Sequence, residues 1–131
     1  MNLPAEHQTI MPYLILQGAS QFIDFTKNVF GASQTHSKAL REDGTIIHAE
    51  ITLNGSTIMV TDVTQDWSTQ TANLFVYVPN ADKTYLKALE NGAVSLMGLS
   101  NQEYGRTCGV TDPFGNVWWI TSVTQSNSNL N

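Results

Sequence analysis

The sequence predicts an α+β fold made of two tandem βαβββ modules, and three observations lead to that prediction. Glycine-containing turns recur after 60 or 61 residues along the chain. Segments of strand-like and helix-like hydrophobicity follow one another in the same order in both halves. Dipeptides typical of tight hairpins separate the later strands of the first half. Duplication of a single strand–helix–three-strand unit explains these observations together.

The first module is expected over residues 9–63. Its opening segment, Ile10–Leu16, is apolar and predicts a strand. Ala19–Phe30 carries apolar side chains at helical spacing, and Gly31 is suited to cap the C-terminus of that helix. The hairpin dipeptides Asp43-Gly44 and Asn54-Gly55 then separate three further predicted strands. These strands are Ser33–Leu40, Thr45–Leu53 and Thr57–Asp62.

The second module is expected over residues 72–123, after a polar linker at 64–71. Its helix, Asp82–Glu90, is predicted to turn Tyr85, Leu86 and Leu89 inward and to end at Gly92. The predicted strands are Asn73–Val78, Val94–Leu99, Arg106–Thr111 and Asn116–Ser122. Residues 124–131 are rich in Ser and Asn and are expected to fray. Residues 1–131 are thus interpreted as one domain.

Composition excludes several classes of partner. Lys and Arg number only six against 11 Asp and Glu, for a net charge of −5, so no nucleic acid and no membrane surface is expected as a partner. No apolar run approaches the roughly 18 residues of a membrane span. The N-terminus lacks a secretory pattern, and the single cysteine, Cys108, is expected to be a buried, inert thiol. A cytoplasmic location is expected.

A family resemblance rests mainly on the run from Tyr104 to Ile120, YGRTCGVTDPFGNVWWI. Met11-Pro12-Tyr13-Leu14 and Asn91-Gly92-Ala93 add to it. These motifs resemble the PhnB-like branch of the vicinal oxygen chelate superfamily, which includes glyoxalases, bleomycin-resistance proteins and dioxygenases. The resemblance implies the glyoxalase/bleomycin-resistance fold, in which curved mixed sheets surround a cavity. It also implies a homodimer.

The superfamily's enzymes hold a divalent metal with four side chains, mainly His and Glu. By resemblance, those positions fall here near Met11 or Pro12, and on Met59, Asn73 and Trp119. None of these side chains is a good ligand for a divalent ion, because such sites use imidazole, carboxylate or thiolate donors. No metal and no other cofactor is therefore expected, and a divalent metal is the disfavoured alternative.

Strand alternation predicts which side chains face the cavity. In the third strand of module one, Ile47, Ala49, Ile51 and Leu53 are assigned to the core, and Ile46, His48, Glu50 and Thr52 to the cavity side. The side chains predicted to bind a small-molecule ligand are Tyr13, His48, Glu50, Met59, Trp67, Phe75, Tyr77, Arg106 and Trp119. The predicted pocket is thus aromatic and apolar with one titratable pair, which suits a small organic ligand.

Several of these residues have a second interpretation. His48 and Glu50 are the candidate catalytic acid and base, but His48 also fits a cross-strand hydrogen bond and Glu50 an exposed position. Arg106 suits either a ligand carboxylate or an ion pair with Glu103 or another carboxylate. Trp67 suits a lid, a dimer contact or a loop anchor. His7 and His36 have no identifiable partner and are expected to be exposed.

The leading hypothesis is a metal-free protein that binds a small aromatic or amphipathic molecule, for sequestration or resistance. The alternative is an enzyme of the superfamily, a lyase, isomerase or dioxygenase that is metal-dependent or uses His48 and Glu50. A third possibility is an interaction module whose cavity is filled by Trp67 and Trp119.

Overall fold

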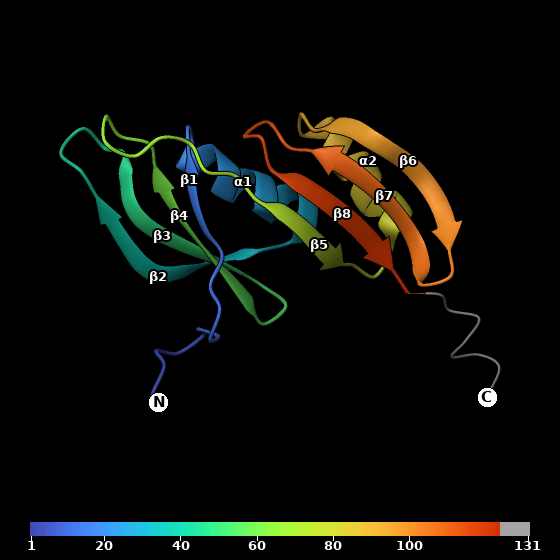
Figure 1. Cartoon of the computed structure of the whole chain (residues 1–131), viewed down its shortest axis with the longest axis horizontal. Helices are drawn as coiled ribbons and strands as arrows, with labels where there is room; N and C mark the ends of the chain where they lie inside the picture. The colour runs from blue at the N-terminus through green and yellow to red at the C-terminus, as the bar shows by residue number, and fades with distance from the viewer. Residues whose placement is uncertain (124–131) are drawn as a thin grey trace. The chain divides into compact units, whose positions relative to one another are not determined.

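The computed structural model describes residues 1–123, so the predicted frayed tail at 124–131 lies outside the described residues. Backbone contacts divide the chain into two units, Met1–Ala72 and Asn73–Asn131. Each unit contains a four-stranded mixed sheet and one helix, in the order strand, helix, three strands (Figure 1). The predicted α+β class and the two tandem βαβββ modules are confirmed.

The first unit has the strand order β1-β4-β3-β2. The central strand β4 pairs in parallel with β1 and antiparallel with β3. The Asn54-Gly55 turn joins β3 and β4 with positive φ at both residues, 51° and 91°, as a type I′ hairpin requires. The elements are β1 (Tyr13–Leu16), α1 (Ala19–Phe30), β2 (Ser33–Leu40), β3 (Ile46–Leu53) and β4 (Ser56–Asp62).

Helix α1 has the predicted bounds, and Gly31 ends it in the left-handed conformation. It buries Phe22, Ile23 and Val29 on one stripe, as the hydrophobic spacing predicted. Asp62, at the end of β4, accepts hydrogen bonds from the backbone N–H groups of Gly18 and Ala19 at the helix N-terminus. This carboxylate also accepts from the N–H of Ile46, and thus connects the helix to two strands.

Strand β1 is shorter than predicted: the Pro12 carbonyl still accepts from the Met59 N–H at 2.9 Å, but the strand itself begins at Tyr13. The side-chain amide of Gln8 takes the place that a continued strand would fill. Its Nε2 donates to the Thr57 carbonyl at 2.9 Å, and its Oε1 accepts from the Thr57 N–H at 3.2 Å. The Thr57 hydroxyl donates to the carbonyl of Glu6. Residues 4–8, here called the N-terminal arm, therefore lie against the first unit's sheet.

The predicted alternation along β3 is wrong at its start. Ile46 is buried and Ile47 is 45% exposed, the reverse of the expectation. The pairing partners of Ala39 and Leu40 are His48 and Ile46, which leaves Ile47 as an extra residue, a β-bulge. Beyond the bulge, Ala49 and Ile51 lie in the core as predicted.

The second unit repeats this arrangement with the strand order β5-β8-β7-β6. Here β8 pairs in parallel with β5 and antiparallel with β7. The buried Asp112 carboxylate organises the β7–β8 turn, accepting from the N–H groups of Phe114 and Asn116 and from the indole N–H of Trp118. The elements are β5 (Asn73–Tyr77), α2 (Ala81–Glu90), β6 (Val94–Gln102), β7 (Gly105–Thr111) and β8 (Val117–Ser122).

The inward face predicted for α2 is wrong at Leu86 and Leu89, while Tyr85 is half-buried. Leu86 is 58% exposed and Leu89 is 36% exposed, whereas Ala81 and Ala88 are fully buried. The stripe that faces the sheet passes through Ala81, Tyr85 and Ala88 at spacings of three and four residues, and Leu86 lies off it. The two small alanines form the buried part of this contact, and leucine hydrophobicity was a misleading guide to it.

Within residues 1–123, none of the helices is both long enough and apolar enough to cross a bilayer.

Candidate functional site

The first unit places a carboxylate between two histidines on its sheet. Glu50 lies in the middle of β3 and is 3% exposed. Its Oε2 is 2.8 Å from Nε2 of His48 and 2.9 Å from Nε2 of His7, and its Oε1 accepts from the Thr35 hydroxyl at 3.2 Å. His48 reaches it from two residues earlier on the same strand face. The predicted His48–Glu50 pair is thus in contact, and Glu50 is buried.

His7 is the member of this cluster that sequence reasoning missed. It was expected to be exposed and without a partner, which is wrong. The N-terminal arm brings it across the sheet, where Gln8 and Glu6 are held by Thr57. The contact joins residues 43 positions apart, outside the reach of any local pattern. His36, the other histidine without an expected partner, is exposed.

Hydrogen bonding keeps Glu50 charged despite its burial. Desolvation by burial raises the pKa of a carboxyl group, but hydrogen bonds from His48, His7 and Thr35 act in the opposite direction and outweigh it. The net effect lowers the pKa of Glu50 below its usual 4.5. At neutral pH the cluster therefore holds a buried anion.

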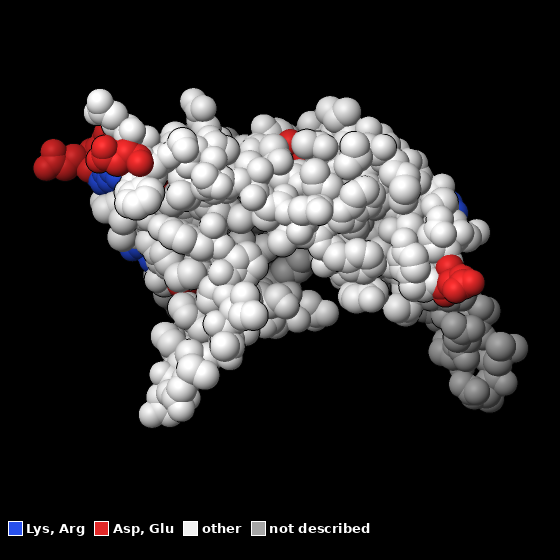
Figure 2. Space-filling view, viewed as in Figure 1, with Lys and Arg blue, Asp and Glu red and all other residues white. Residues whose placement is uncertain are grey.

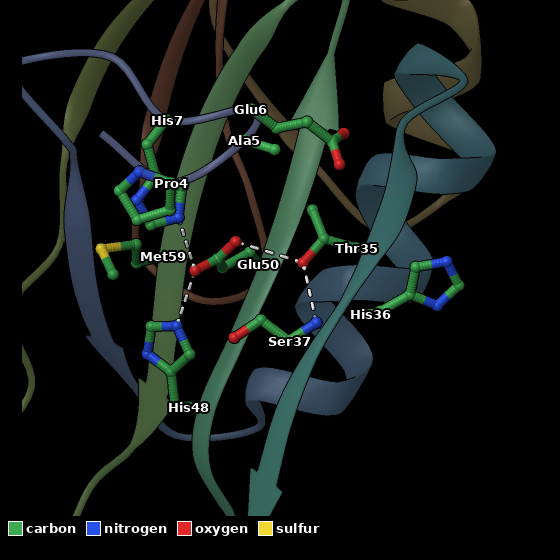
Figure 3. Close-up of a pocket in the computed structure, with 10 residues that line it drawn as sticks. All are labelled: Pro4, Ala5, Glu6, His7, Thr35, His36, Ser37, His48, Glu50 and Met59. Atoms are coloured by element: carbon green, nitrogen blue, oxygen red, sulfur yellow. Dashed lines mark hydrogen bonds and ion pairs between the residues drawn. The ribbon is translucent and has the colours of Figure 1, made fainter. Parts of the chain in front are cut away.

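This anion lines a pocket of about 380 Å³ (Figure 3). His7 and His48 lie on opposite sides of the Glu50 carboxylate, and His36 points away from it. Four lining residues, Pro4 to His7, belong to the N-terminal arm. The rest come from the sheet: Thr35, His36, Ser37, His48, Glu50 and Met59. The predicted ligand residues His48, Glu50 and Met59 are thus brought together.

The second unit exposes aromatic rings on one sheet face. Phe75 is 51% exposed, Tyr77 64% and Tyr104 54%. Phe75 and Tyr77 meet edge to face with ring centroids 5.3 Å apart, and Phe75 and Tyr104 are 6.2 Å apart. Figure 2 shows few charged side chains over this sheet, seen from the side opposite α2. Phe75, Tyr77, Tyr104 and Trp119 are called the aromatic face below.

Trp119 is fixed on this face by two contacts. It pairs with Phe75 on one side and with Gly109 on the other, so the three residues lie in a row across the sheet. A Cβ on Gly109 would lie 2.4 Å from Cζ3 of the indole, so the ring needs the missing side chain. The indole Nε1 donates to Oδ1 of Asn73 at 2.7 Å. Gly109 is a further residue of this face that sequence reasoning missed.

The remaining predicted ligand residues lie elsewhere in the two units. Arg106 forms an ion pair with Asp82, with Nε and Nη2 at 2.9 and 3.2 Å from the two carboxylate oxygens. Of the two interpretations of Arg106, the structure shows the ion pair, with Asp82 in place of Glu103. Trp67 is 65% exposed on its loop. Tyr13, 54% exposed, pairs with Met59 at the edge of the first sheet.

Cys108 lies on the buried face of β7. It is fully buried, and its Sγ lies 3.8 Å from the carbonyl oxygen of Ile120. Burial raises the pKa of the thiol to about 11, so the reactive thiolate is scarce at neutral pH. The structure thus gives Cys108 the properties of an inert core residue.

The donor set does not fit a divalent metal. Asn73 and Trp119, two positions implied by resemblance as metal ligands, are hydrogen-bonded to each other. Met59 offers a thioether, which hard and borderline divalent ions bind weakly. In the described range 1–123, no three His, Cys, Asp or Glu side chains are arranged to hold a metal ion. Both histidines of the Glu50 cluster are directed at one carboxylate oxygen instead.

Two tandem βαβββ modules, each a four-stranded mixed sheet with one helix, are the architecture of glyoxalase-like proteins. A family model confirms it: the chain belongs to the Glyoxalase/Bleomycin resistance protein/Dioxygenase superfamily, whose model matches residues 14–120. An uncharacterized protein of Mycobacterium bovis is 30% identical over 121 residues, which cover 83% of this chain and 79% of that protein.

Solved structures share the fold at lower identity. The PhnB protein from Bacillus cereus is 21% identical with a TM-score of 0.69, covering 88% of this chain and 100% of that chain. TnmS3, an antibiotic-binding protein from Streptomyces sp. CB03234, is 17% identical with a TM-score of 0.67, covering 90% of this chain and 100% of that chain. At these identities the likeness establishes the fold.

Proposed function

We propose that this protein binds a small aromatic or amphipathic molecule without a metal ion, in a sequestering or resistance role. The observation that carries the proposal is the aromatic face. Phe75, Tyr77 and Tyr104 are each exposed by half or more, and the ring centroids of the two tyrosines lie 5.3 and 6.2 Å from that of Phe75. Monomeric proteins seldom expose such rings together unless a ligand or partner covers them. The antibiotic-binding protein of the same fold is consistent with this role.

The rigidity of Trp119 supports the same proposal. A ring seated on Gly109 and hydrogen-bonded to Asn73 loses little freedom when a ligand stacks beside it. Aromatic pairs contribute about 0.5–1.5 kcal/mol beyond the area they bury, so a planar ligand gains over a saturated one of equal size.

The test compares two ligands with the same two-ring carbon skeleton and one hydroxyl group, the aromatic 2-naphthol and its saturated analogue 2-decalol. Their binding is followed by NMR on the Trp119 indole N–H. We expect 2-naphthol to shift this signal saturably and to bind about tenfold more tightly than 2-decalol. Phe75→Leu, which keeps an apolar side chain, should remove most of the difference. Tyr85→Leu, which removes a ring from α2, is the matched control. Equal affinity for both ligands would contradict the proposal.

A second candidate function is metal-free acid/base catalysis at His48. Because Nε2 of His48 lies 2.8 Å from a buried carboxylate, a proton on Nε2 leaves Nδ1 free to accept another. Lyases and isomerases both use such a proton transfer. Acceleration of α-proton exchange in hydroxyacetone, lost in His48→Ala and kept in His36→Ala, would support it. Equal exchange rates in the unaltered protein, His48→Ala and His36→Ala would reject this candidate function.

We further propose that the chain forms a homodimer in the cytoplasm. The edge strand β6 carries Val94 and Leu96, which are 68% and 55% exposed. An edge strand with exposed apolar side chains is open to association with another chain, and a second copy is the simplest partner.

A further inference from the structure

We infer that the pocket at Glu50 is a second binding site, selective for small organic cations such as protonated amines. All residues that line it belong to the first unit, so the inference goes beyond the proposed aromatic-ligand binding and does not depend on it.

The first step is the kind of hydrogen bond that Glu50 receives. The buried carboxylates Asp62 and Asp112 accept from backbone N–H groups, which the fold holds in place: three for Asp62 and two for Asp112. Asp112 also accepts from the side chains of Asn116 and Trp118. The two aspartates connect turns and helix ends. Glu50 instead accepts from three side chains, of His7, His48 and Thr35, each of which can rotate away.

The second step is access. Glu50 lines a pocket with a volume of about 380 Å³, and neither Asp62 nor Asp112 is part of that lining. That volume holds a molecule of several non-hydrogen atoms. A structural carboxylate needs no such space, and a binding carboxylate does.

The third step is charge. The described residues that line the pocket include two carboxylates, Glu6 and Glu50, and no lysine or arginine. An opposite charge beside a buried carboxylate stabilises its charged form. A protonated amine supplies that charge and up to three N–H donors, while an anionic ligand is repelled.

The fourth step separates an organic cation from a metal ion. His7 and His48 approach the same oxygen from opposite sides, so their nitrogens do not converge on one point beside it (Figure 3). The lining also contains the apolar side chains of Pro4, Ala5 and Met59, which suit the carbon part of an organic molecule.

The test uses three non-aromatic probes of nearly equal shape: cyclohexylmethylamine, cyclohexylmethanol and cyclohexanecarboxylate. Ring signals of His7 and His48 report binding by NMR, and the Trp119 indole signal reports the aromatic face. The amine should shift both histidine signals saturably and leave Trp119 unmoved. It should bind about tenfold or more tightly than the alcohol, and the carboxylate should not bind.

Variants assign the effect to Glu50. Glu50→Gln should weaken amine binding about tenfold or more. Glu42→Gln, which removes an equal charge from an exposed turn of the same unit, should leave it unchanged. The comparison of the amine, the alcohol and the carboxylate uses the unaltered protein alone. It therefore tests the selectivity for cations even if Glu50→Gln does not fold.

Equal binding of amine and alcohol would overturn the inference, as would a zinc ion that displaces the amine and shifts both histidines at one equivalent. Equal affinity of the unaltered protein for 2-naphthol and 2-decalol, together with selective binding of the amine, would reject the aromatic face and leave this site standing. Selective binding of 2-naphthol, together with equal binding of amine and alcohol, would reject this site and leave the aromatic face standing. The two proposals can therefore fail separately.

Discussion

At the residue scale, the charge of Glu50 governs how the first unit responds to acid. Its pKa in the folded protein lies below 4.5, so its charged form stabilises the fold above that pH, and this stabilisation is lost as the pH falls through the lowered pKa. We expect the free energy of unfolding to drop between pH 5 and pH 3, and Glu50→Gln to lose less than the unaltered protein over this range. Urea unfolding at a series of pH values measures the free energy of unfolding of both proteins. Parallel curves for the two proteins would contradict the prediction.

The thiol of Cys108 gives a second prediction at this scale. Because burial raises its pKa to about 11, a disulfide reagent should modify no thiol in the folded protein at pH 8 within the time that modifies one equivalent in urea. Absorbance after addition of the reagent, with and without urea, makes the comparison. Rapid modification in the folded state would show that β7 opens locally.

Gly109 gives the third prediction at the residue scale. Gly109→Ala places a methyl group where the Trp119 ring lies, and overpacking of this kind costs about 1–3 kcal/mol. We expect lower stability, a displaced indole N–H signal and weaker binding of 2-naphthol. Gly98→Ala is the matched control, since a Cβ there meets nothing within 4 Å. If both variants behave alike, the close approach of Trp119 to Gly109 does not matter.

At the element scale, Asp62 connects α1 to the sheet. Asp62→Ala removes the acceptor for three backbone N–H groups, two at the start of α1 and one at the start of β3; the hydrogen bonds from Ala19 and Ile46 are buried and that from Gly18 is part-buried. Unsatisfied donors and the lost helix cap together should lower the free energy of unfolding by about 3 kcal/mol. Urea unfolding measures the loss, with the exposed Asp66→Ala as control. A loss below about 0.5 kcal/mol, typical of surface changes, would contradict this role.

Most elements were predictable because their signals are local. The bounds of α1 and β2 follow from hydrophobic spacing and from Gly31, and the hairpin turns follow from Asp43-Gly44 and Asn54-Gly55. Two features were not predictable. The bulge at Ile47 depends on the pairing of β3 with β2, and the exposure of Leu86 depends on how closely α2 lies against its sheet.

At the scale of the whole molecule, the proposed homodimer gives the last prediction. Leu96→Lys places a charge on an exposed position of the edge strand β6 and should convert the dimer to a monomer, because burying an unpaired charge is costly. Sedimentation velocity distinguishes masses of about 14.4 kDa and twice that value. Ile10→Lys, at an 82% exposed position of the first unit, is the control. A monomer before substitution would reject the dimer itself.

The sequence by itself determined the α+β class, the duplication and the family, because turns, periodicity and the run before Ile120 are local features. It also singled out His48 and Glu50, which lie two residues apart on one strand face. Only the tertiary structure decided that His7 completes their cluster and that Gly109 seats the Trp119 ring. The physical reason is that these contacts depend on the path of the N-terminal arm and on strand register, which no local pattern specifies.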